Sequence, residues 1–139
     1  MEITQEMLKN PNYELLNRSF FVKGVDIDFF IWPLVRVLNL NGYKTMASCE
    51  GHYPTTYSRH LLPWVRLDME TYNTNDQKRI ARVRKELSTF DHNGIKWDVV
   101  KGDPGVEYFN FVVPVTIKPI EDLQRSVWPV SRYLEERLQ

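Results

Sequence analysis

The chain has 139 residues, of which 42% are hydrophobic and 26% charged, a length and composition typical of one globular domain. Its 18 basic and 18 acidic residues cancel, which excludes a uniformly basic nucleic-acid coat or an acidic tail but allows a local basic face. The single cysteine excludes an intrachain disulfide. The longest apolar run (29–35) is too short to span a bilayer, and the first residues lack the pattern of a signal peptide. We therefore expect a cytoplasmic protein that does not bind membranes.

The N-terminal third is expected to contain a helical lead-in, a strand and a helix. Residues 1–18 form the lead-in, and the apolar residues 20–22 form a short first strand. Apolar side chains between residues 27 and 38 then recur at helical spacing. This pattern predicts a helix that Asp26 or Asp28 caps and that an Asn-Gly turn ends.

The middle of the chain is expected to contain two strands and a helix. Residues 43–49 follow the Asn-Gly turn directly and are predicted to be a strand. Apolar and polar residues alternate over 64–70, which is typical of a strand with one buried face. Residues 75–90 return to helical spacing, with Asn75 or Asp76 as the cap.

The C-terminal third is expected to contain two strands and a final helix. Apolar residues alternate over 95–99 and again over 107–118, and the helix spans about 121–138. Pro114 lacks a backbone donor, so it predicts that the second strand lies at the sheet edge or carries a bulge. We therefore predict an α+β fold with residues 1–139 as a single domain. Its mostly antiparallel or mixed sheet has roughly four to five strands, with helices on one face, built from two helix–strand–strand units and a C-terminal helix.

Two segments share a Trp-Pro pair. Residues 31–38 match residues 127–134 at Trp, Pro, Arg and Leu. Two equivalent helices could frame a pocket in this way. The interpretation we favour is that each pair marks a helix start, because proline is preset for the first helical turn.

The sequence Cys49-Glu50-Gly51-His52 ends the predicted strand 43–49 and begins a long loop. This loop, residues 50–63, has about fourteen residues, whereas hairpin loops usually have about 2–5. Long loops in compact domains are usually functional or disordered, and the aromatic side chains of this loop argue against disorder. The loop is therefore the candidate functional site.

The cysteine and histidines of the loop suit two chemistries. In the first, Cys49 is a catalytic nucleophile, His52 or His60 is the base that activates its thiol, and Glu50 orients the imidazole. In the second, Cys49 and His52 chelate a metal ion such as zinc. His60 then completes an open site, for which Glu50 and Asp68 are further ligand candidates.

A third interpretation is ligand binding without chemistry. Hydroxyls, backbone amides and guanidinium groups hold anions, and aromatic rings stack on bases. The residues suited to this role are Ser48, Gly51, Tyr53, Tyr57, Arg59, Trp64 and Arg66. A purely structural interpretation also stands, in which Cys49 is a small core residue on the strand face of Tyr43, Thr45 and Ala47.

The motif Ser48-Cys49-Glu50-Gly51-His52 resembles small bacterial and bacteriophage proteins that carry a Ser-Cys-x-Gly-His signature and have no assigned activity. It is also distantly similar to the wybutosine-synthesis methyltransferase family, in which a Ser-Cys-Ser-Gly-Arg motif follows a strand. That family acts on a modified guanosine of transfer RNA with S-adenosylmethionine, so the resemblance implies an RNA ligand and that cofactor. Ser48, Cys49 and Gly51 match its motif, whereas Glu50 and His52 replace its serine and arginine.

The helix predicted over 75–90 is strongly basic. Lys78, Arg82 and Lys85 share one face at helical spacing, and Arg79 lies beside them. Such a face could contact the phosphates of nucleic acid. An ordinary solvated face opposite the apolar stripe is the commoner outcome.

Two functions from different classes remain open. In the first, the protein is a small enzyme or binding domain whose loop forms a pocket for a small anionic, nucleotide-like or modified-RNA ligand. In the second, it is a phage- or host-directed protein-interaction module whose loop 50–64 is the recognition surface, rich in residue types common at binding hot spots. Substitution of Cys49 should abolish turnover in an enzyme and leave an interaction module intact.

Overall fold

The structure of the protein is a computed structural model. The described residues are 20–22, 25–27, 30–51, 62–102, 107–114 and 118–138. The helical lead-in predicted over 1–18 lies outside these ranges, so it stays a prediction.

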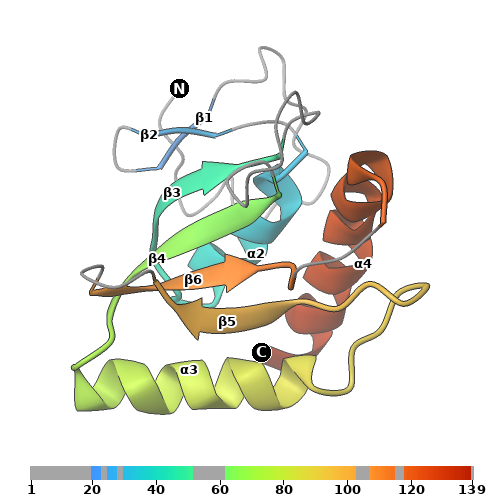
Figure 1. Cartoon of the computed structure of the whole chain (residues 1–139). Helices are drawn as coiled ribbons and strands as arrows, with labels where there is room; N and C mark the ends of the chain where they lie inside the picture. Colours follow the sequence, from blue (N-terminus) through green and yellow to red (C-terminus); the bar gives the residue numbers. More distant parts are fainter. Residues whose placement is uncertain are drawn as a thin grey trace.

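The fold combines a small antiparallel hairpin, a four-stranded antiparallel sheet and helices (Figure 1). The elements in chain order are β1 (Phe20–Val22), β2 (Val25–Ile27), α2 (Trp32–Leu40), β3 (Thr45–Cys49), β4 (Trp64–Glu70), α3 (Thr74–Leu87), β5 (Asp98–Lys101), β6 (Tyr108–Val112) and α4 (Ile120–Leu138). The hairpin pairs β1 with β2, and the larger sheet has the strand order β3-β4-β6-β5. This arrangement confirms the predicted α+β class.

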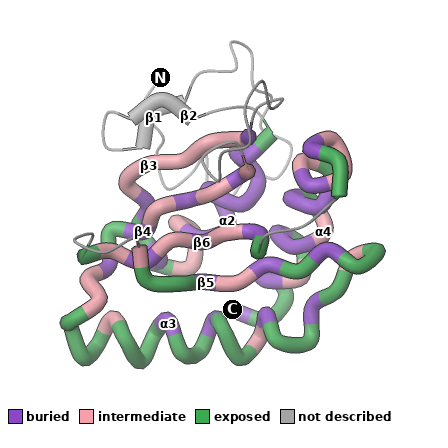
Figure 2. Tube along the Cα trace, in the orientation of Figure 1, coloured by how far each residue is buried: buried purple, intermediate pink, exposed green. Residues whose placement is uncertain are grey.

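Within the described residues, the helices pack on only one face of the sheet. Val65, Leu67 and Met69 of β4 are buried, and Phe111 of β6 lies opposite Val65 in the same core. Figure 2 shows the alternation of buried and partly exposed residues along β4. The intervening residues of β4 are partly or fully exposed, as strand alternation requires. We call the side away from α2, α3 and α4 the open face.

Helix α2 begins at Trp32, so the predicted caps are wrong. Asp26 lies in β2, where it pairs with Phe21, and Asp28 lies outside the described residues. Residues 25–27 belong to β2, and the helix has Ile31 at its N-cap position without a side-chain hydrogen bond. Pro33 occupies its first turn, where a missing N–H breaks no helical hydrogen bond.

Helix α3 begins slightly earlier than predicted because its cap is Asn73. The Asn73 side chain accepts a hydrogen bond from the Asp76 amide at 3.0 Å, which satisfies one of the unpaired donors of the first turn. Asp76, one of the predicted caps, instead accepts a bond from the Glu70 amide at 2.9 Å. This second bond fixes the turn between β4 and α3.

Strand β6 lies inside the sheet, so the edge position predicted from Pro114 is wrong. It pairs with β4 on one side and with β5 on the other. The strand ends at Val112, two residues before Pro114, so the proline removes no ladder hydrogen bond. Val115 and Ile117, the last two residues of the predicted stripe, lie outside the described ranges.

A largely buried ion pair joins α2 to α4. Both terminal nitrogens of Arg36 donate to Oε1 of Glu135 at 3.2 Å. The Arg36 side chain is only 10% exposed, and its Nε is buried without a hydrogen-bond partner within the described ranges. The Arg36 charge is therefore buried between α2 and α4, the two helices that contain the Trp-Pro segments, and Glu135 is its partner.

Candidate functional site

The end of β3 and the start of β4 bring Cys49 and Trp64 together on the open face. Thr45 pairs with Leu67 and is buried, but an irregularity between Thr45 and Ala47 shifts the register of the strand pair. After that shift Ala47 pairs with Arg66, and Cys49 pairs with Trp64. Cys49 is therefore not a continuation of the buried face of Thr45, as the structural interpretation supposed, and its exposure is intermediate.

The two residues after Cys49 are held by hydrogen bonds. The Gly51 amide donates to the Cys49 sulfur at 3.4 Å, and Gly51 has a φ of +88°, which favours glycine. The Glu50 carboxylate accepts a hydrogen bond from the Phe30 amide at 2.9 Å, just before α2. Gln124 of α4 donates to the Glu50 carbonyl at 3.1 Å. Glu50 is thus positioned by contacts with residues far away in the sequence.

Trp64 and Arg66 lie on the same face of β4, beside Cys49 of β3. The Arg66 guanidinium carbon lies 5.8 Å from the centroid of the Trp64 ring. The Arg66 Nε donates to Oδ1 of Asn110 on β6 at 3.2 Å, which fixes the side chain across two neighbouring strands. We call Cys49, Trp64, Arg66 and Asn110 the open-face cluster.

The remaining predicted site residues divide into two groups. Ser48 pairs with Val65, so it lies on the helix face, opposite to Cys49, and its hydroxyl is buried without a hydrogen-bond partner among the described residues. The predicted residues of the loop itself lie outside the described ranges: His52, Tyr53, Tyr57, Arg59 and His60. Within those ranges no group of three His, Cys, Asp or Glu side chains is placed to hold a metal ion, so the predicted set of Cys49, His52 and His60 stays a prediction.

Part of the predicted basic face on α3 makes contacts within the protein. Arg79 donates to the Gly42 carbonyl at 2.6 Å, and its guanidinium carbon lies 4.6 Å from the centroid of the Tyr43 ring. The Tyr43 hydroxyl donates to the Arg79 carbonyl at 3.1 Å. Burial raises the pKa of Tyr43 above its usual value, although the charges of Arg79 and Arg82 oppose this shift. Arg79 therefore packs the helix against the turn after α2.

Two more arginines of α3 are also engaged. Arg82 donates to a backbone carbonyl at the end of α4 at 3.3 Å, and Arg84 binds Asp98 through two nitrogens at 3.0 and 3.2 Å. The hydrogen bond to Asp98 raises the pKa of Arg84, which keeps it charged. Lys78 and Lys85 are exposed and have no ion pair within the described ranges. They are the members of the predicted face best placed to meet an outside partner.

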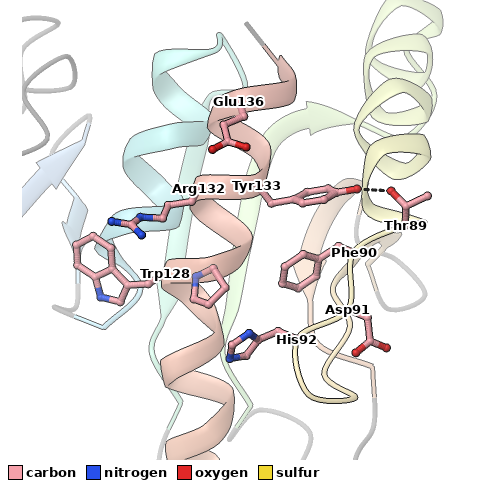
Figure 3. A pocket seen from close by; sticks show the side chains of 9 residues that line it. Thr89, Phe90, Asp91, His92, Trp128, Arg132, Tyr133 and Glu136 are labelled. Carbon is pink, nitrogen blue, oxygen red and sulfur yellow. Dashed lines mark hydrogen bonds between the residues drawn. The ribbon is translucent and has the colours of Figure 1, made fainter.

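A groove lies beside α4, and its lining contains none of the predicted site residues. It has a volume of about 690 Å³ and lies between α4 and the turn that follows α3. In Figure 3, Trp128 and Arg132 extend from one side of α4, and Phe90 and His92 approach from the turn on the other side. The residues lining this α4 groove are Thr89, Phe90, Asp91, His92, Trp128, Pro129, Arg132, Tyr133 and Glu136. The repeated Trp-Pro pair was the sequence feature that could have led to it.

Comparison of the chain with protein-family models, curated proteins and solved structures gave no match. The two family resemblances of the Ser48–His52 motif therefore stay predictions. No helix in the described part of the chain has the length and apolar character needed to cross a membrane.

Proposed function

We propose that this protein binds a nucleotide-like ligand on the open face of its sheet, at the end where β3 and β4 meet. The observation that carries this proposal is the open-face cluster, in which a tryptophan ring and a fixed guanidinium lie together beside Cys49. An indole ring gives a base a surface for stacking, and an arginine gives a phosphate or carboxylate its strongest hydrogen-bond partner.

The position of the cluster relative to the candidate loop supports the proposal. The loop leaves the sheet after Cys49 and returns at Trp64, and these two residues pair directly across the strands. The open-face cluster therefore lies at the point where the predicted loop leaves and rejoins the sheet. The loop adds two tyrosines, an arginine and two histidines, which suit base stacking and anion binding.

Cys49 is the residue through which such a ligand would be transformed, if the protein is an enzyme. The Gly51 amide that points at its sulfur is a donor of the kind that stabilises negative charge on a thiolate. His52 would be the base, and zinc or S-adenosylmethionine are the cofactors that the motif and its resemblance imply. These roles rest on the sequence and form the chemical part of the proposal.

Fluorescence anisotropy of a fluorescein-labelled 12-nucleotide single-stranded RNA, with AMP and GMP as competitors, tests the binding. We expect saturable binding that Trp64→Leu and Arg66→Met each weaken about tenfold, since stacking on one aromatic residue is worth about 1–3 kcal/mol. Trp128→Leu and Arg125→Met are the matched controls, because both residues are exposed on α4 and lie outside the open-face cluster. Thermal unfolding of each variant shows whether it is folded.

The outcomes separate the two functional classes. Equal weakening by the cluster variants and the α4 controls would contradict the proposal, as would binding that no variant changes. Absence of RNA and nucleotide binding would favour the protein-interaction module. Cys49→Ser then tests the chemistry: it should leave binding within about twofold, because the hydroxyl keeps the size of the thiol, while abolishing any turnover that depends on a thiolate.

A further inference from the structure

The α4 groove has aromatic walls that are held in place by contacts within the protein. The rings of Phe90 and Tyr133 meet edge to face, with centroids 5.2 Å apart. The Tyr133 hydroxyl donates to the Glu86 carbonyl at 2.9 Å and is also in contact with the Thr89 hydroxyl. The Arg137 guanidinium lies 3.6 Å from the centroid of the Tyr133 ring. These contacts hold the rings of Phe90 and Tyr133 in position without a bound partner.

Trp128 and Arg132, on the other side of α4, are exposed parts of the groove lining (Figure 3). Trp128 is 53% exposed although it is a large aromatic residue in the middle of α4. Neither its indole N–H nor the Arg132 guanidinium has a hydrogen bond or ion pair within the described ranges. Large exposed tryptophans with a free donor are typical of binding surfaces.

Some polar groups of the groove have partners within the protein and others do not. Asp91 accepts a bond from the Gly94 amide at 2.8 Å and lies 4.0 Å from the Lys96 ammonium. Glu136 lies 3.8 Å from the Arg137 guanidinium. The two carboxylates therefore already have partners, whereas the donors of Trp128 and Arg132 do not. A partner that meets Trp128 and Arg132 must therefore supply acceptors.

We propose that the α4 groove binds a proline-rich segment of another protein in the polyproline II conformation. Such a segment has no internal hydrogen bonds and its prolines lack N–H groups, so it presents mainly carbonyl acceptors. These match the unpaired donors of Trp128 and Arg132. Proline rings pack on aromatic walls, and the stiff conformation reduces the entropy lost on binding. This inference concerns a different surface from the proposed nucleotide site and does not depend on it.

Titration of the ¹⁵N-labelled full chain with decaproline, followed by two-dimensional NMR, tests the proposal. The indole N–H signals are assigned with the single Trp→Phe variants. We expect the signal of Trp128 to shift on addition of up to about 5 mM peptide, a range that reveals even millimolar affinity. The signal of Trp64 should stay in place. The buried Trp97, whose indole already donates to Ser126 at 2.9 Å, serves as an internal control.

Variants and a control peptide complete the test. Trp128→Ala should weaken decaproline binding about tenfold or more, as expected of a central aromatic contact, and Arg132→Gln should weaken it about fivefold. Arg125→Gln, on the same helix but outside the groove, should have no effect. A glycine–serine peptide of equal length should not bind. No shift of the Trp128 signal, a shift centred on Trp64, or equal binding of the glycine–serine peptide would each overturn the proposal.

Discussion

The two Trp-Pro pairs have the same sequence and opposite surroundings. Trp32 is 4% exposed in the core, whereas Trp128 is 53% exposed beside the α4 groove. Pro33 lies in the first turn of α2, where it costs nothing, but Pro129 lies inside α4. The comparison shows that a dipeptide does not determine its environment, because its position along the helix decides which face it occupies.

The prediction that Trp-Pro marks a helix start is therefore right once and wrong once. In α4 the helix begins at Ile120, eight residues before Trp128. Its first turn carries Glu121 and Asp122, which interact favourably with the positive end of the helix dipole. A strong amphipathic pattern on both sides of Pro129 overrides the preference of proline for a first turn.

The largest expected effect is the loss of stability on substitution of the buried Trp32. Trp32→Ala should lower the free energy of unfolding by about 3–5 kcal/mol, because it leaves a cavity in the core. Urea denaturation followed by circular dichroism measures this loss. A loss below about 1 kcal/mol would mean that the surroundings of Trp32 collapse onto the cavity and that the two sites differ less than their exposure indicates.

The second expected effect concerns the ion pair between the same two helices. Glu135→Ala should lower the free energy of unfolding by about 2–3 kcal/mol, because it leaves the buried Arg36 guanidinium without its partner. Arg36→Met should cost less, because it removes the buried charge and keeps a side chain of similar length. Glu136→Ala is the control, since that side chain is 77% exposed. A smaller loss for Glu135→Ala than for Arg36→Met would contradict this account.

A smaller effect of opposite sign distinguishes the two prolines. Pro129→Ala should raise the free energy of unfolding by about 1 kcal/mol, because alanine restores the helical N–H that proline lacks. Pro33→Ala should lower it by about 0.5 kcal/mol, since proline in the first turn restricts the unfolded chain without strain. Differential scanning calorimetry of both variants gives the two signs. Equal signs would show that the helix interior around Pro129 is already adapted to the proline.

The sequence predicts much of the fold because periodicity reports burial. The alternation over 64–70 and the helical stripe of α3 place their residues on the faces that the structure shows. The register shift between Thr45 and Ala47 is not readable in the same way. A single extra residue moves Cys49 from the expected buried face to the open face, and no residue type in the strand predicts this shift.

The open-face cluster was predicted only in part, for a related reason. Trp64 and Arg66 were candidates because of their chemistry, but Asn110, which fixes Arg66, belongs to a strand more than forty residues later. Such a contact depends on the pairing of β4 with β6 in the sheet. Along the chain, α3 and β5 lie between these two strands. Local patterns contain no information about that order. Local patterns do not reveal the α4 groove either, because its lining combines residues of α4 with the segment that follows α3.

The smallest expected effect on stability is the one most informative about function. Trp128→Ala should change the free energy of unfolding by less than about 0.5 kcal/mol, because a half-exposed side chain without a hydrogen-bond partner in the described ranges contributes little to the folded state. Urea denaturation measures this change beside that of Trp32→Ala. A loss above about 2 kcal/mol would show that Trp128 is part of the packing of α4, and its exposure would then give no support to a binding role. A loss close to zero leaves an exposed tryptophan that stability does not require, and its energetic contribution is then expected in binding.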